Sequence, residues 1–150
     1  MPAGPSPDAP LPAANAPGGR YHTVLLHGGF AYVSGHLPRV DGEIAFTGKV
    51  GGDCTVEDAR AAARTSALGC LSSLAAKLGS LDRIEQVLKV TGYVASAEGF
   101  NRQTQIIDAA SELLTERLGA RGEHARSAIG VYQLPGDVPV EIDMMCAVRA

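Results

Sequence analysis

The pattern of hydrophobic and polar positions begins with two short runs that are rich in Val, Leu, Phe and Tyr. The first run covers residues 23–27, the second covers residues 30–34, and Gly28-Gly29 lies between them. Two β-favouring runs around a dipeptide that accepts positive φ are typical of a β-hairpin. After further turn signals, a weaker candidate strand covers residues 43–47.

Apolar residues then recur three or four positions apart in two longer segments, which is the spacing of an amphipathic helix. In the first segment, Thr55 followed by Asp58 resembles a capping box, and the apolar stripe runs on to Gly79. The stripe of the second segment begins at Phe100 and stops at Gly119. The members of the two stripes are Ala63, Ala67, Cys70, Leu71, Leu74 and Leu78, and then Phe100, Ile107, Ala110, Leu114 and Leu118.

Three further strands are predicted at residues 86–95, 126–133 and 140–148. The last of them places Val140, Ile142, Met144, Cys146 and Val148 on one apolar face. We expect the final two strands to pair with each other across the 134–139 loop. Strands early and late, with two helices between them, predict an α+β fold made of one sheet and one helical layer. The pattern leaves the strand order open.

Length and composition divide the chain into two parts. A chain of 150 residues is close to the commonest size of a single domain, so we expect one domain over residues 20–150. Six of the nine prolines lie within residues 1–17, among Ala and Gly. We therefore predict that residues 1–19 form a flexible Pro/Ala/Gly-rich arm or an extended strap.

Charge and cysteine usage exclude several classes of protein. The 13 Lys and Arg residues stand against 16 Asp and Glu residues, and the resulting net charge of −3 disfavours binding to nucleic acid. The three cysteines are far apart and form no C-x-x-C motif, which favours a reducing, cytoplasmic location over a disulfide framework. No apolar run approaches the ~18 residues of a membrane span, and the first twenty residues lack the features of a signal peptide.

Arg126 is the strongest candidate for a functional residue, because small and apolar residues surround it in its predicted strand. A guanidinium in such surroundings must meet a carboxylate, reach solvent through a cleft, or bind an anionic ligand. A structural salt bridge with Glu141, Asp143 or another acid is the first alternative. Small residues at Ala128 and Gly130 leave room for a hollow beside the cation, which favours the ligand.

Glu141 and Asp143 are predicted on the face of the last strand opposite its apolar row, either as solvated residues or as groups that orient water or move a proton. If the last two strands pair, Glu141 lies about six residue steps, or ~20 Å, from Arg126 along the sheet. That distance is too long for one small ligand. If both residues serve one site, we expect them to come from different subunits of an oligomer.

Other candidate chemistries are disfavoured. His22, His27, His36 and His124 lack metal-ligand spacing, so we predict no metal site and expect these histidines in turns or on the surface. Gly48-Lys49-Val50 lacks the glycine and the Ser or Thr that a phosphate-binding loop requires. The cysteines are expected at the start or on the buried face of predicted elements, which disfavours a nucleophilic thiol.

Several motifs together resemble the Rid family, the YjgF-like reactive-intermediate deaminases that are also labelled endoribonuclease L-PSP-like proteins. These motifs are YVSGHLP (32–38), KVTGYV (89–94), the Gly-Phe pair at 99–100, HARSAIGV (124–131) and LPGDVPVEI (134–142). The likeness covers about residues 20–148 and is to a subfamily outside the archetypal RidA group. It implies a chorismate-mutase-like subunit with one mixed β-sheet, a homotrimer with clefts between subunits, and no cofactor.

The resemblance also implies roles for individual residues. Arg126 corresponds to the arginine that grips the carboxylate of an enamine or imine such as 2-aminoacrylate. Glu141 corresponds to the glutamate that positions the hydrolytic water. Tyr21 corresponds to a tyrosine that lines the cleft, and Ser34 and Gly35 carry the family's Ser-Gly element. The implied reaction is hydrolytic deamination to a 2-keto acid and ammonia.

Some positions depart from the archetype. Ala128 stands in place of a cysteine beside the arginine, Arg20 in place of a proline, and His36 in place of a glutamine; at the position of an asparagine in the second helix, Thr104 is nearest in spacing. The anchor for a small carboxylate is retained. Two alternatives to a deaminase stay open. One is a non-catalytic trimer that binds a small carboxylate metabolite, and the other is a ribonuclease, which the acidic composition disfavours.

Overall fold

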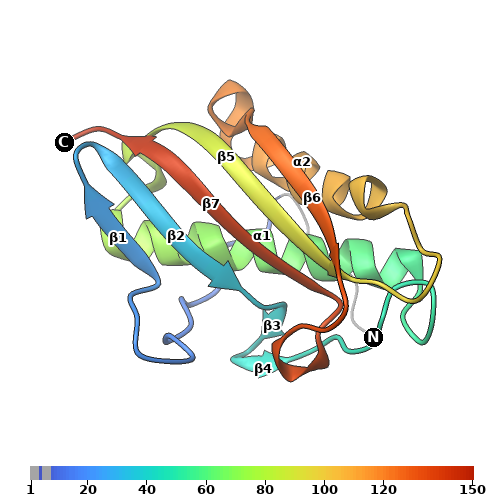
Figure 1. The fold of residues 1–150 in the computed structure, drawn as a ribbon. Helices are drawn as coiled ribbons and strands as arrows, with labels where there is room; N and C mark the ends of the chain where they lie inside the picture. The colour runs from blue at the N-terminus through green and yellow to red at the C-terminus, as the bar shows by residue number, and fades with distance from the viewer. Residues whose placement is uncertain (1–3, 5–7) are drawn as a thin grey trace.

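A mixed sheet packed on two helices forms the body of the protein (Figure 1). The computed structural model describes residue 4 and residues 8–150. The sheet has the strand order β1-β2-β7-β5-β6, in which β6 runs parallel to β5 and all other neighbours are antiparallel. Its strands are β1 (Val24–His27), β2 (Phe30–His36), β5 (Ile84–Ala95), β6 (Ala125–Val131) and β7 (Val140–Val148). The predicted α+β fold, one mixed sheet covered on one face by two helices, is confirmed.

Local sequence signals set the ends of both helices. Helix α1 (Val56–Leu78) begins after Thr55, whose side chain accepts a hydrogen bond of 3.1 Å from the backbone N–H of Asp58. It ends at Gly79, which adopts φ 86°. Helix α2 (Gln103–Leu118) begins three residues later than the apolar stripe suggested. Short elements complete the chain: β3 (Arg39–Val40), β4 (Glu43–Ile44), and the 3₁₀ turns η1 (Leu81–Arg83), η2 (Gly119–Gly122) and η3 (Pro135–Asp137).

The hydrophobic core lies between the sheet and the helices. The apolar row predicted for the last strand faces this core, and Val140, Ile142, Met144 and Cys146 are buried there. Helix α2 approaches the sheet closely at Gly92, where a Cβ atom would lie 2.5 Å from Cγ1 of Ile107. The opposite face of the sheet is left open, and its side chains include Tyr32, Tyr93, Glu141 and Asp143.

The prediction that the last two strands pair with each other is wrong. Strand β5 lies between them and bonds to β6 on one side and to β7 on the other. Strand β7 carries alternating residues that are completely buried, whereas every residue of β6 is half-buried or exposed. A strand with a fully buried face is best placed in the middle of the sheet, where the helices cover it. Strand β7 accordingly occupies the centre of the sheet and β6 an edge.

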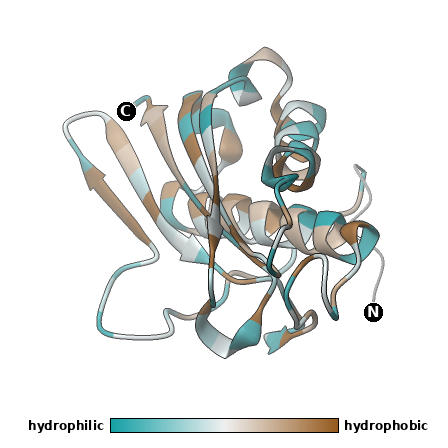
Figure 2. Cartoon of the chain, turned by 45° about the vertical axis from the view of Figure 1, so that its right-hand side comes forward, coloured by the Kyte–Doolittle hydropathy of each residue, from teal (hydrophilic) through white to brown (hydrophobic). Residues whose placement is uncertain are grey.

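The predicted hairpin is confirmed and forms the other edge of the sheet. Gly28 and Gly29 adopt φ 59° and 84°, the left-handed values that a tight two-residue turn needs. Strand β1 is hydrophobic although it lies at a free edge (Figure 2). Leu25 is 54% exposed on it. This edge therefore presents apolar surface and unpaired backbone groups to its surroundings.

Residues 8–19 contain no helix or strand. Leu11 is half-buried and packs against the core, and most of the residues around it are exposed. Flexibility of the whole 1–19 arm stays a prediction, and residues 1–3 and 5–7 lie outside the described part. Within that part, neither helix is apolar enough over a sufficient length to cross a membrane.

Candidate functional site

A cleft of about 610 Å³ opens where the ends of β2 and β7 meet the loop before β1. Its walls bring together four residues to which the family resemblance assigned roles: Tyr21, Ser34, Gly35 and Glu141. The remaining lining residues are Gly18, Leu37, Arg39, Ile44, Pro135 and Gly136. The volume is within the range that small-molecule sites occupy.

Glu141 lies directly against the backbone of Gly35. The pairing of β2 with β7 is interrupted between Val33 and His36, and Gly35 sits in this irregular stretch. A Cβ atom at Gly35 would lie 2.9 Å from Cδ of Glu141 and closer still to its Oε2. Glycine is therefore needed here for the carboxyl group to occupy its position.

The surroundings of Glu141 raise the pKa of its carboxyl group above the ordinary value. Burial raises the pKa of this carboxyl group, and the negative charge of Asp143 on the same face raises it further. Asp143 accepts a hydrogen bond of 2.9 Å from the hydroxyl of Tyr93. A carboxyl group with a raised pKa can take up and return a proton closer to neutral pH than an ordinary glutamate.

Hydrogen bonds tie the loop that carries Tyr21 to strand β2. The Ser34 hydroxyl donates to the carbonyl of His22 at 2.7 Å, and the backbone N–H of Ser34 donates to Thr23 at 2.9 Å. The Tyr21 hydroxyl accepts from the backbone N–H of Gly18 at 3.1 Å. Ser34 thus holds one wall of the cleft in place, while the Tyr21 ring stays 47% exposed at its mouth.

Arg39 is a site residue that the sequence analysis missed. It lines the cleft and donates a hydrogen bond of 3.1 Å to the carbonyl of Gly42. Its position three residues after the SGH sequence at 34–36 was a usable signal, because the chain continues there along the same wall. The cleft therefore contains a cation as well as the carboxyl group of Glu141.

Arg126 lies on the other side of the sheet, facing helix α2. It is paired in register with the buried Val90, so its side chain is directed toward the helical layer. Its Nη1 donates to Asp108 Oδ1 at 2.8 Å and to Ser111 Oγ at 3.0 Å. The acid that meets the cation is thus Asp108, and neither Glu141 nor Asp143 is its partner.

The space expected beside Arg126 is partly filled. Ala128 lies on the same face as Arg126 and packs against the core. At Gly130, a Cβ atom would lie 2.7 Å from the Nε2 atom of Gln103 and 3.3 Å from Oγ of Ser96. The side chain of Gln103 therefore occupies the hollow that was predicted at this end.

Arg126 and Glu141 do not share a site within one chain. Through β5, Arg126 is level with Val90 and Glu141 with Tyr93, so the two are three residues apart along the sheet. Their strands are also two strand spacings apart, because β5 lies between β6 and β7. The separation is therefore about 10 Å along the strands and about 10 Å across them, and the two side chains face opposite sides of the sheet. The earlier distance of ~20 Å rested on the wrong strand pairing. Its consequence still holds: a small ligand meets both residues only if two subunits contribute.

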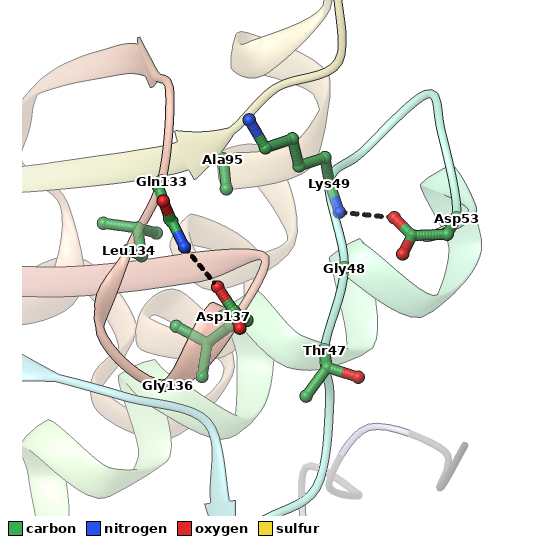
Figure 3. Close-up of a pocket in the computed structure, with 10 residues that line it drawn as sticks. Thr47, Gly48, Lys49, Asp53, Ala95, Gln133, Leu134, Gly136 and Asp137 are labelled. Carbon is green, nitrogen blue, oxygen red and sulfur yellow. Dashed lines mark hydrogen bonds between the residues drawn. The ribbon is translucent and has the colours of Figure 1, made fainter.

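A second cavity, of about 480 Å³, lies beyond the end of β5 between the loops 47–53 and 133–138 (Figure 3). Asp53 accepts a hydrogen bond of 2.8 Å from the backbone of Lys49, and Asp137 accepts one of 2.6 Å from Gln133. The Lys49 ammonium lies 3.3 Å from the centre of the Tyr132 ring. Gly136 borders this cavity and the first one, so the η3 turn separates them.

The cysteines lie where the sequence predicted them, whereas one histidine does not. His36 is buried, contrary to expectation, with Nδ1 2.6 Å from the Ser34 carbonyl and Nε2 2.7 Å from Ser73 Oγ. Burial lowers its pKa. The three cysteines are buried, and burial raises the pKa of Cys54 to about 11 and of Cys146 to about 12. No group of three or more metal-ligating side chains occurs among the described residues.

Comparison with known proteins decides the family. Residues 7–144 match the family described as "YjgF/chorismate mutase-like, putative endoribonuclease". The chain belongs to the YjgF family. Its chorismate-mutase-like fold is thereby shown as well. The departures at His36 and Ala128, which the resemblance indicated, are consistent with a subfamily outside the RidA group.

Individual relatives within the YjgF family cover most of the chain. Protein TCP17 of Trypanosoma cruzi is 40% identical over 136 residues, which are 90% of this chain and 85% of that protein. The crystal structure of Atu1372 from Agrobacterium tumefaciens, a protein of unknown function, is 40% identical with a TM-score of 0.86, covering 89% of this chain and 86% of that one. A "putative endoribonuclease" from Shewanella oneidensis MR-1 is 27% identical with a TM-score of 0.89, covering 93% and 92%.

Proposed function

We propose that the protein hydrolyses small enamine or imine carboxylic acids, such as 2-aminoacrylate, to 2-keto acids and ammonia. The observation that carries the proposal is the cleft in which Tyr21, Ser34 and Gly35 surround the half-buried carboxyl group of Glu141. We further propose that Arg126 of a neighbouring subunit completes this cleft. A homotrimer then contains composite sites at its subunit boundaries.

In this mechanism Arg126 orients the ligand by binding its carboxylate through two parallel N–H···O bonds. Water attacks the carbon of the protonated imine while the ionised Glu141 accepts a proton from it, so that a neutral carbinolamine forms. Glu141 returns this proton to the nitrogen. The C–N bond then breaks as the carbinolamine hydroxyl gives its proton to Glu141, which leaves the 2-keto acid and ammonia. Tyr21 walls the cleft, and no step requires a cofactor. Because free imines already hydrolyse in water, a modest rate enhancement is sufficient.

Assembly is supported by the open face and free edges of the sheet. Tyr32 and Ile129 are exposed there at 44% and 42%, and Leu25 lies beside Tyr32 in register. Exposed apolar patches of this kind mark protein–protein interfaces. Light scattering after size-exclusion chromatography measures the subunit number, and a monomeric protein would contradict the composite site.

The decisive assay couples the protein to a pyridoxal-phosphate dehydratase that generates the imine in situ. We expect faster ammonia release than in the uncatalysed reaction, lost in Arg126→Ala and in Glu141→Gln. Arg60→Ala is the matched control, because Arg60 also forms an ion pair with helix α2, at Glu112, and lies outside the cleft. A rate equal to background, or full activity in Arg126→Ala, rejects the proposal.

A second candidate is a non-catalytic trimer that binds a small carboxylate metabolite. It is favoured by Ala128, which stands where the resemblance places a cysteine. Calorimetric binding of keto acids with no turnover supports this candidate over the deaminase. Digestion of RNA that disappears in Glu141→Gln would instead support a ribonuclease.

A further inference from the structure

One face of helix α2 holds the guanidinium of Arg126. Asp108 and Ser111 are three residues apart on this face, and both accept hydrogen bonds from Nη1 of Arg126. One turn before Asp108, the carbonyl of Thr104 accepts from Nη2 at 3.4 Å. The cation is therefore held by one charged group and two neutral ones.

The Asp108 carboxylate is solvated well enough to be displaced from Arg126. Its side chain is 49% exposed, whereas that of Arg126 is 18% exposed. An ion pair with one well-solvated partner contributes little to stability, because water replaces the lost contact at low cost. A ligand carboxylate that reaches Arg126 meets this internal carboxylate on the same nitrogen.

Ser111 holds Arg126 in a different way, without neutralising it. The Gly122 carbonyl can only accept a hydrogen bond, so His124 Nδ1, 2.6 Å away, must be the donor. In the neutral ring Nε2 is then an acceptor, and the Ser111 hydroxyl donates to it at 2.8 Å. The same hydroxyl oxygen accepts from Arg126 at 3.0 Å. This chain of bonds fixes the guanidinium and leaves its charge available.

We propose that Asp108 is a specificity-determining residue that competes with the ligand carboxylate for Arg126, while Ser111 and His124 are positioning residues that keep Arg126 in place during the exchange. The proposal rests on the proposed function, in which Arg126 anchors a carboxylate. Competition from Asp108 weakens the binding of small monocarboxylates. It therefore also prevents the keto-acid product from remaining on the anchor.

The test compares three variants by calorimetry with 2-oxobutanoate as the probe. We expect Asp108→Asn to lower the Kd about five-fold, because the competing charge is removed and one exposed ion pair is worth about 1 kcal/mol. We expect Ser111→Ala to raise the Kd by a similar factor. Glu112→Gln removes the same charge from the next turn of α2, where Glu112 pairs with Arg60, and should leave the Kd unchanged.

Competition predicts tighter binding in Asp108→Asn and weaker binding in Ser111→Ala. A purely structural role of Asp108 and Ser111 would instead weaken binding in both variants. In the coupled assay Asp108→Asn should lower KM and leave kcat unchanged. If the wild type binds 2-oxobutanoate through Arg126 and Asp108→Asn binds no tighter, the role of Asp108 is refuted and the proposed function survives. If neither the wild type nor Asp108→Asn binds or turns over, both proposals fail.

Discussion

The substitution Gly35→Ala tests the contact on which the candidate site depends. The new methyl group would lie 2.9 Å from Cδ and 3.2 Å from Cγ of Glu141, whereas an ordinary contact requires at least about 3.4 Å. The backbone at Gly35 is not in the left-handed region, so alanine fits its conformation. The strain must therefore be relieved by the Glu141 side chain, which rotates out of the cleft.

The expected cost in stability is small. Glu141 sits where burial raises its pKa, so its ionised carboxylate gains hydration when it moves out. Replacing glycine by alanine also restricts the unfolded chain, which offsets about 0.4–1 kcal/mol of any loss. We expect a net destabilisation of about 1 kcal/mol or less, which lowers the Tm by about 2–4 °C in a domain of this size.

The expected cost in activity is larger. A positioned proton acceptor contributes about 10²–10⁴-fold in enzymes, and the lower limit applies to an imine that is already reactive. We therefore expect kcat to fall about 100-fold in the coupled deaminase assay, to the level of Glu141→Ala. The double variant Gly35→Ala/Glu141→Ala should be no worse than either single variant, because both remove the same group.

Gly52→Ala is the matched control. A Cβ atom there makes only ordinary contacts at 3.4 Å, and the residue lies outside the cleft. Full activity of Gly35→Ala, with a crystal structure that shows Glu141 displaced, would refute the role of this carboxyl group. A large drop in Tm would refute the argument that the side chain, and not the backbone, relieves the strain.

Three further predictions follow from burial and packing. Asp143→Asn removes a negative charge that raises the pKa of Glu141, so the acid limb of the kcat/KM profile should move to lower pH; a limb that stays in place contradicts the assigned cause. His36 has a pKa lowered by burial, so its contribution to stability is present above its ordinary value of 6.5 and is lost as the pH falls toward its folded pKa. His36→Gln should therefore flatten the dependence of Tm on pH between about 7 and 5, and an equally steep curve would exclude His36 as the source. Gly92→Ala places a methyl group 2.5 Å from Cγ1 of Ile107. Overpacking that costs about 1–3 kcal/mol should lower the Tm by roughly 2–12 °C. An unchanged Tm would show that α2 moves away from the sheet at little cost.

Local features of the fold were predictable because they depend on neighbouring residues. Thr55 and Gly79 mark the ends of α1, and Gly28-Gly29 forms the hairpin turn, in agreement with the sequence pattern. The alternation along 140–148 also identified the buried face of β7. Each of these signals lies within a few positions of the structure that it determines.

Strand order and ion-pair partners were not predictable in the same way. Periodicity shows which face of a strand is buried and carries no information about which strand lies beside it, so β5 was not expected between β6 and β7. The pairing of Arg126 with Asp108 follows from that order, because an edge strand next to β5 lies under α2. Tyr21, Ser34, Gly35 and Glu141 were grouped through the family resemblance, and Arg39 was missed because the resemblance assigned it no role.

The burial of all three cysteine thiols protects them from oxidation. Oxidants attack the thiolate, and a thiol whose pKa is raised to about 11 or 12 is almost never in that form at neutral pH. Cys70, which is completely buried, is protected in the same way. With alanine at position 128, none of the three cysteine thiols lies in strand β6, and all three are shielded from peroxide by burial.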